Sequence, residues 1–225
     1  MKAIIFDSST LISFAMNGLL PELKELKKIF KGKFLITEDV KRETIDKPIT
    51  IKRFTLEALK IKQLIDEKII EMPESVGEHG EEISKKTNEI LERANKIFIS
   101  KDKEIKIISS GEASCLALSR ILTEKGIVNI LAVDERTTRM LVENPEGLMR
   151  FLEKKMHTKI KVNKDNFKSF KGFKIIRSTE LIYVAYKKKV VGISDLKLLD
   201  ALLWAMKFKG CAISNEEIEE IKKIG

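Results

Sequence analysis

Two acidic residues of this chain directly follow runs of strand-forming residues. Asp7 follows the apolar run at residues 2–6, and Asp134 follows the apolar run at residues 128–133. In an open α/β fold, a residue between a strand and the next helix lies at the carboxyl end of the sheet, where such folds keep their ligand crevice. Asp7 and Asp134 are therefore candidates for binding or catalysis. A structural interpretation is also open, in which Asp7 only caps the helix that follows it.

Two glutamates occupy helix positions that could bring them to the same edge of the sheet. Glu43 lies three residues after Val40 in a helix that Thr37 caps, so both side chains can share the face directed at the sheet. Glu112 lies in the first turn of a helix whose residues are almost all small or apolar. The helix dipole stabilises such a carboxylate by less than about 1 kcal/mol, which hardly offsets its desolvation. We therefore expect a cation or a hydrogen-bond donor beside Glu112.

The elements that must position these residues alternate between strands and helices. Short apolar runs bounded by polar or turn residues predict strands, and apolar residues at helical spacing predict helices between them. Strand and helix in alternation indicate an α/β fold with a central parallel sheet. The predicted strands cover residues 2–6, 34–36, 69–72 and 128–133, and the predicted helices cover 10–15, 21–32, 49–68, 81–98, 110–126, 137–142, 178–189 and 195–208.

Composition excludes several classes of protein. No apolar run is long enough to span a bilayer, and Cys115 and Cys211 stand in apolar surroundings without metal-site spacing, so we expect a cytoplasmic protein with reduced cysteines. His79 and His157 are far apart in polar stretches, which argues against a zinc site. Glycine-rich phosphate-binding loops are absent. The net charge of +9 fits either nucleic-acid binding or the ion-paired surface of a heat-adapted protein.

The acidic motifs, taken in order, resemble those of the PIN-domain nucleases, in their prokaryotic toxin-like or RNA-processing branch. The motifs are Asp7 after a strand, Glu43 in an early helix, Gly111-Glu112 opening an apolar helix, and Asp134 after another strand. The resemblance implies a three-layer α/β/α fold around a central parallel sheet. It implies a catalytic core at residues 1–149, a basic Lys/Phe insertion at 150–177, and helices at 178–225 that complete the domain.

The resemblance also implies a divalent-metal-dependent ribonuclease. Its metal ligands and catalytic residues would be Asp7, Glu43, Glu112 and Asp134. Converging carboxylates repel one another, a divalent ion removes that cost, and an all-oxygen site suits Mg²⁺ or Mn²⁺. Ser9 is expected to hold a water or the scissile phosphate. Glu135 is expected to contact the metal ligands without binding the metal itself.

One departure from the family pattern leaves an alternative open. PIN domains more often have Asp where this chain has Glu112. A rival alignment replaces Glu112 with Asp200, which lies in the predicted helix at 195–208 and is followed by an acidic stretch after Gly210.

The segment 150–177 is strongly basic and contains interleaved aromatic residues. A basic groove wall with aromatic rings suits single-stranded RNA, through phosphate contacts and base stacking. Alternatively, the rings pack into a small core and only the lysines face solvent. The lysines assigned to RNA are Lys164, Lys168, Lys171 and Lys174, and the rings are Phe167, Phe170 and Phe173.

The expected partners follow from this reading. They are RNA, single-stranded or structured, a second copy of the chain, and an antitoxin or RNA-processing partner, with no membrane. Two other functions stay open from the sequence. One is a PIN-like module that binds RNA without cleaving it, and the other is a scaffold subunit of an RNA-processing complex with an exposed apolar face.

Overall fold

The central sheet is parallel and positions the acidic residues. The computed structural model describes residues 1–224; Gly225, the last residue of the predicted C-terminal region, lies outside them. The strand order is β2-β1-β5-β7, with every pairing parallel. The α/β class and the strands predicted at 2–6, 34–36 and 128–133 are confirmed. The strands are β1 Lys2–Phe6, β2 Lys33–Leu35, β5 Val128–Ala132 and β7 Ile175–Ile176.

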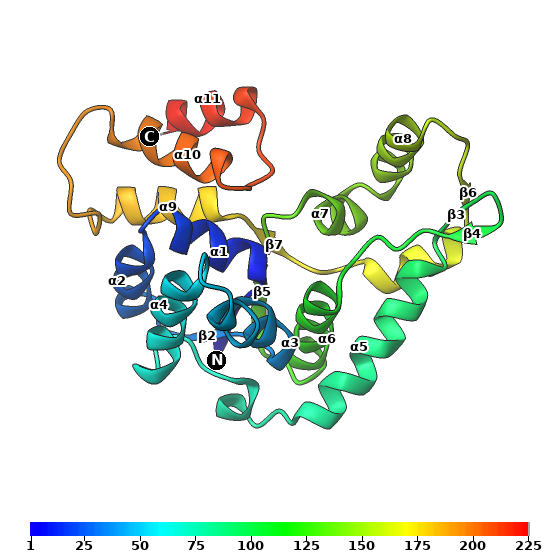
Figure 1. The fold of residues 1–225 in the computed structure, drawn as a ribbon, viewed down its shortest axis with the longest axis horizontal. Coiled ribbons are helices and arrows are strands. Elements are labelled where there is room, and N and C mark those ends of the chain that lie inside the picture. Colours follow the sequence, from blue (N-terminus) through cyan, green and yellow to red (C-terminus); the bar gives the residue numbers. More distant parts are fainter. Residues whose placement is uncertain (225) are drawn as a thin grey trace.

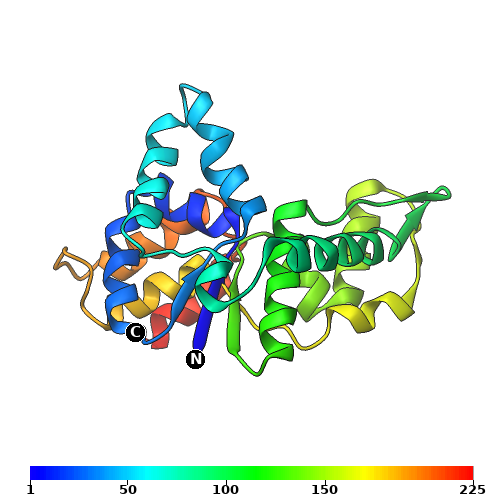
Figure 2. The ribbon, with the colours of Figure 1, turned by 90° about the horizontal axis from the view of Figure 1, so that it is seen from below.

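Helices cover both faces of this sheet, as a three-layer α/β/α arrangement requires (Figures 1 and 2). On one face lie α1 Ser8–Met16, α2 Leu20–Ile29 and α9 Ser178–Lys187, and outside α9 follow α10 Leu198–Phe208 and α11 Asn215–Ile224. On the other face lie α3 Glu38–Lys41, α6 Ser110–Glu124 and, outside α6, α5 Gly80–Asn95. The core between the layers is apolar because β1, β5 and α6 have almost no exposed side chains on the faces they share.

The region after Glu43 departs from the predicted pattern. Glu43 lies in η1 Arg42–Asp46, a π-helical turn that continues α3. The helix predicted at 49–68 is shorter, because η2 Pro48–Thr50 and a turn precede α4 Thr55–Asp66. Pro48 is the first residue of η2, where its missing N–H is tolerated, and a turn at residues 51–54 separates η2 from α4. The strand predicted at 69–72 is reduced to one parallel bridge between Glu71 and Leu35, followed by the 3₁₀ turn η3 Pro73–Val76.

A second, antiparallel sheet lies away from the first, in a lobe beside α5 and α7 Arg136–Glu143 (Figure 1). Its strand order is β4-β3-β6, and none of these strands is among those that the sequence predicts. The strands are too short to show a periodicity of two, so the sequence carries little signal for them. The elements of this lobe are β3 Phe98–Ser100, β4 Lys103–Glu104, α8 Pro145–Met156, β6 Lys161–Val162 and η4 Lys164–Phe170.

Both ends of the basic segment 150–177 belong to other elements of the fold. Residue 150 lies inside α8, and β7 at its other end pairs with β5 in the central sheet. Val133 donates its N–H to the Ile176 carbonyl at 2.9 Å, which extends this pairing to the residue before Asp134. The boundary predicted at residue 177 thus cuts off a strand of the core sheet.

No helix within residues 1–224 is long and apolar enough to cross a membrane. Cys115 and Cys211 are buried free thiols, as predicted.

Candidate active site

Asp7 and Asp134 lie side by side at the carboxyl edge of the central sheet because β1 and β5 are paired neighbours. The register aligns Phe6 with Ala132, and the Asp7 N–H donates to the Ala132 carbonyl at 2.9 Å. Ser9 links the two acids, since its hydroxyl donates to Asp7 Oδ2 at 2.5 Å and accepts from the Asp134 N–H at 3.1 Å. The structure thus brings together Asp7, Ser9 and Asp134, as their positions in the sequence predict.

Each aspartate uses only one of its two carboxylate oxygens. Asp7 caps α1 by accepting from the Ser9 N–H at 3.1 Å, so the capping interpretation is correct for Oδ2. Asp134 Oδ1 accepts from the Ser178 N–H at the start of α9 at 2.7 Å. Asp7 Oδ1 and Asp134 Oδ2 are buried and have no hydrogen-bond partner. A buried carboxylate oxygen without a partner is costly, so capping alone does not account for these residues.

Glu43 reaches the same region from the π-turn η1. Its Oε2 accepts from the Ser8 hydroxyl, at the start of α1, at 2.8 Å. The carboxylate also lies against Gly111, where an added Cβ would be 2.5 Å from Glu43 Oε2. Gly111 therefore leaves the space that Glu43 occupies beside the first turn of α6.

Glu112 is buried, and its expected donors are present. Ser109 and Glu112 form a capping box at the start of α6, in which Glu112 Oε2 accepts from the Ser109 N–H at 2.5 Å. The N-cap residue of α6 is thus Ser109. The other oxygen, Oε1, accepts from the Thr138 hydroxyl on α7. Glu112 therefore has a structural role that does not require a metal.

The charges of Glu112 and Glu43 both act on the Asp7 carboxyl, and we call these three residues, together with Asp134, the acidic cluster. Burial and, after it, the charge of Glu112 raise the pKa of Asp7 to about 7, with a smaller contribution from the charge of Glu43, while the hydrogen bonds from Ser9 oppose the rise. Burial also raises the pKa of Glu112. The thiol of Cys115, in α6, has its pKa raised by burial and then by the charges of Asp7, Glu112 and Glu43. Mutual repulsion of this kind is what a divalent cation relieves.

The donor set fits a hard cation only in part. Two unpartnered carboxylate oxygens, Asp7 Oδ1 and Asp134 Oδ2, meet the preference of Mg²⁺ and Mn²⁺ for oxygen ligands. Within residues 1–224, however, no group of three or more His, Cys, Asp and Glu side chains lies close enough together to hold a metal ion. Glu43 and Glu112 are turned toward Ser8, Ser109 and Thr138. Joining a metal site would require a rotation of these glutamates.

The remaining acidic candidates lie at different distances from this cluster. Glu135 is the N-cap of α7, accepts from the Thr138 N–H at 2.9 Å, and its charge raises the pKa of Glu112. It therefore lies beside the cluster, as predicted. Asp200 is on α10, half-exposed, and pairs with Lys222 of α11 at 2.6 Å. This position favours Glu112 over Asp200 as the third acid.

The four lysines assigned to RNA are all exposed, and the aromatic rings between them are not. Lys168 makes one ion pair, with Asp165 at 3.5 Å. Phe170 is buried, Phe167 packs edge-on against Phe98 at 5.9 Å, and the Arg120 guanidinium lies over the Phe173 ring at 4.5 Å. The rings pack within the lobe, which agrees with the interpretation that they form a small core and not with stacking on RNA bases. The exposed lysines are Lys164, Lys168, Lys171 and Lys174.

Sequence reasoning missed the residues that orient the acids. Ser8 and Thr138 donate to Glu43 and Glu112, and Gly111 makes room for Glu43. A partial signal existed: Gly111 directly precedes Glu112, and Thr138 lies in the first turn after Glu135. The contacts themselves join residues 26 and 35 positions apart, which no local pattern reveals.

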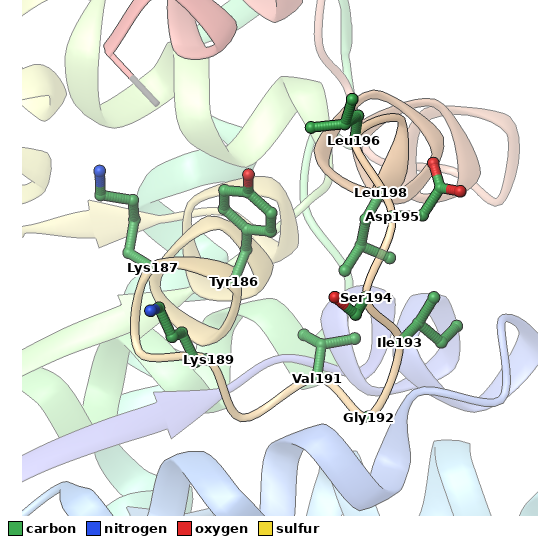
Figure 3. Close-up of a pocket in the computed structure, with 10 residues that line it drawn as sticks. All are labelled: Tyr186, Lys187, Lys189, Val191, Gly192, Ile193, Ser194, Asp195, Leu196 and Leu198. Atoms are coloured by element: carbon green, nitrogen blue, oxygen red, sulfur yellow. The ribbon is translucent and has the colours of Figure 1, made fainter.

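A hollow of about 740 Å³ lies elsewhere, between the end of α9 and the start of α10. Figure 3 shows Tyr186 on one side of it and the loop with Ile193, Ser194 and Leu196 on the other. None of the predicted catalytic residues lines this hollow.

Comparisons with protein-family models, curated proteins and solved structures find no match for this chain. The resemblance to PIN domains therefore rests on the sequence motifs, and the function must be argued from the site.

Proposed function

We propose that the chain is a divalent-metal-dependent ribonuclease that hydrolyses phosphodiester bonds of RNA, with a PIN-like active site. The observation that carries the proposal is that Asp7 and Asp134, at the carboxyl ends of two neighbouring strands, each have one buried carboxylate oxygen without a hydrogen-bond partner. The raised pKa of Asp7, caused in part by Glu112 and Glu43, supports it because these charges need a counter-ion. The cofactor would be Mg²⁺ or Mn²⁺.

The chain's own groups divide the work as follows. Asp7 and Asp134 would hold the ion, and Glu43 and Glu112 would complete the site after turning from their hydrogen bonds. When bound, such an ion lowers the pKa of water and stabilises negative charge on a phosphate during in-line displacement. Ser9 fixes Asp7 Oδ2 and the Asp134 backbone, so that the other oxygens keep their direction. Thr138 holds Glu112 and favours its charged form.

Binding of Mn²⁺ tests the ligand assignment without requiring a substrate. Bound Mn²⁺ is counted by electron paramagnetic resonance for the wild type and for Asp7→Asn, Asp134→Asn and Asp200→Asn. The first two variants should lose tight Mn²⁺ binding, while Asp200→Asn should bind like the wild type because Asp200 pairs with Lys222. Equal binding by all four proteins would refute the assignment, and loss of binding in Asp200→Asn as well as in Asp7→Asn would favour the rival alignment.

A second candidate function is RNA binding without cleavage. The observation that favours it is the full set of donors on Glu112, together with the absence of a three-acid group within residues 1–224. If the protein binds RNA in a salt-sensitive way but does not cleave it with any divalent metal tried, RNA binding without cleavage becomes the better proposal. The scaffold alternative would use an apolar face such as the one beside the hollow in Figure 3, where Leu196 is fully exposed.

A further inference from the structure

The helical arm that carries Glu43 ends in a tip with exposed basic and aromatic side chains that are not part of the candidate active site. The arm consists of η1, η2 and α4, residues 42–66, and its tip is the turn at residues 47–54. Figure 2 shows the arm rising beyond the edge of the sheet toward which β1 runs, and Figures 1 and 2 place it on the opposite side of β1 and β5 from the lobe with α5 and α8. Acids at that edge thus lie between the arm and the lobe.

The tip is basic and carries an exposed aromatic ring. Lys47, Lys52, Arg53 and Phe54 are all exposed, and no carboxylate occurs from residue 47 through residue 56. Within residues 1–224 no salt bridge engages Lys47, Lys52 or Arg53. The Arg53 guanidinium lies over the Phe54 ring at 5.5 Å. These cations therefore do not stabilise the fold through ion pairs within the described residues.

The apolar residues of the arm divide into an inner and an outer set. Ile45, Ala58, Ile61 and Leu64 are buried against the body of the protein. The outer set is unusually exposed for its type. Its members, with exposed fractions, are Ile51 at 47%, Phe54 at 38%, Leu56 at 59% and Leu59 at 47%.

The tip is also ordered before it binds anything. Ile51 donates its N–H to the Pro48 carbonyl at 2.9 Å, and Phe54 donates to the Ile51 carbonyl at 2.7 Å. The Thr55 hydroxyl donates to the carbonyls of Ile49 and Ile51 at 3.2 and 3.1 Å. A backbone held by such turns loses little conformational freedom on binding, which favours affinity.

We propose that this tip binds single-stranded RNA, with Phe54 stacking on a base and Lys47, Lys52 and Arg53 contacting phosphates. Aromatic faces beside cations recognise unpaired bases, and cations alone contact the backbone. The inference deepens the proposed function, because Glu43 lies on the same arm only four residues before Lys47. RNA bound at the tip is thereby directed toward the carboxylates at the sheet edge.

A second copy of the chain fits this tip less well than RNA does. A symmetric dimer centred on the tip would bring the same three cations of each copy together, with no carboxylate between residues 47 and 56 to pair with them. RNA offers the opposite charge and a flat apolar face at once. Charge complementarity therefore selects RNA over a second copy.

The test is RNA affinity measured in EDTA, where no metal-dependent cleavage occurs. A fluorescein-labelled single-stranded RNA oligonucleotide is titrated with the wild type, with Phe54→Ala, with Phe54→Tyr, and with Lys52→Ala/Arg53→Ala. The control is Phe208→Ala/Lys209→Ala, another exposed aromatic residue next to an exposed cation, on α10. The oligomeric state of each protein is measured alongside by light scattering.

Phe54→Ala should weaken binding about fivefold or more, and Phe54→Tyr should restore it, because stacking needs the ring. Lys52→Ala/Arg53→Ala should lower the slope of log affinity against log salt by about 1.4, since each phosphate contact on a single strand contributes about 0.7. The control should bind like the wild type. Unchanged affinity and salt slope in the tip variants would overturn the inference, as would a dimer that dissociates in Phe54→Ala while RNA binding stays the same.

Failure of this inference is separable from failure of the proposed function. If the wild type cleaves RNA with Mn²⁺ and the tip variants bind RNA normally, the tip inference is wrong and the nuclease stands. If no metal supports cleavage and the tip variants lose affinity, the tip is an RNA site on a protein that is not a nuclease.

Discussion

Replacing Asp7 by Asn should make the metal-free protein more stable at alkaline pH, although it should abolish function. The pKa of Asp7 is raised from 3.8 to about 7 by burial and by the charges of Glu112 and Glu43. The unfolded chain therefore loses this proton near pH 4, while the folded protein keeps it until about pH 7. Stability falls as pH rises between these two values, because the folded state binds the proton more tightly.

The magnitude follows from the size of the shift. A shift of about 3.2 pKa units corresponds to about 4 kcal/mol, which is fully expressed above pH 8. At pH 5 less than half of this cost is present, because the cost grows with every pH unit between the unfolded-state and folded-state pKa values. Asn cannot ionise, and it caps a helix as well as Asp does. The stability of Asp7→Asn relative to the wild type should therefore rise by about 2–3 kcal/mol between pH 5 and pH 8.5.

Urea unfolding in EDTA at these two pH values measures the effect. The pH-dependent part is diagnostic, because any cost of burying the Asn amide group shifts both values equally. The matched control is Asp200→Asn, whose side chain is half-exposed and paired with Lys222. A stability difference between Asp7→Asn and the wild type that is the same at pH 5 and pH 8.5 would refute the reasoning that a buried, charge-coupled carboxyl lies at the end of β1.

Three further changes probe the surroundings of the acids and the lobe. Thr138→Val should shift the pH midpoint of Mn²⁺ binding upward and cost about 1–3 kcal/mol of stability, because the Thr138 hydroxyl lowers the pKa of buried Glu112. Gly111→Ala should weaken Mn²⁺ binding, measured by the same titration, because its Cβ would be 2.5 Å from Glu43 Oε2. Lys168→Glu/Lys171→Glu should weaken RNA binding and reduce its salt dependence, measured by fluorescence anisotropy.

Each of these changes has a control or a contrary outcome. Gly80→Ala places a Cβ near the start of α5, where nothing lies within 4 Å, so it should leave Mn²⁺ binding unchanged. If Gly111→Ala binds Mn²⁺ as Gly80→Ala does, Glu43 is not a ligand. If the pH midpoint of Mn²⁺ binding is unchanged in Thr138→Val, Glu112 is not a ligand of the metal. Normal RNA affinity after charge reversal at Lys168 and Lys171 would make the lobe purely structural.

The central sheet was predictable because its strands are continuous apolar runs that end in turns or acids. The run at residues 2–6 and the run ending at Val133 have this form, and they carry Asp7 and Asp134 to one edge. Strands that alternate with helices form a parallel sheet, and the carboxyl ends of its neighbouring strands meet at one edge. Ser9, which follows Asp7 by two residues, lies at the same edge, and its contact with a water or a phosphate stays a prediction.

The parts that escaped prediction depend on contacts between distant residues. The sheet β4-β3-β6 has strands of two or three residues, too short for a periodic signal. β7 is also only two residues long and is recognisable only once β5 is in place. For Glu112 the sequence predicts a cation or a hydrogen-bond donor, and only the folded chain shows that the donors are the Ser109 backbone and the Thr138 hydroxyl. The π-turn that carries Glu43 likewise has no sequence pattern of its own.

The most direct test of the central claim is cleavage of a labelled single-stranded RNA pool. The wild type and Asp7→Asn are incubated with the pool in Mn²⁺, in Mg²⁺ and in EDTA, after urea unfolding has shown that both proteins are folded. The site predicts cleavage by the wild type in Mn²⁺ or Mg²⁺, none in EDTA, and none by Asp7→Asn. Cleavage by Asp7→Asn at the wild-type rate, or cleavage that persists in EDTA, would contradict a metal-dependent nuclease centred on Asp7.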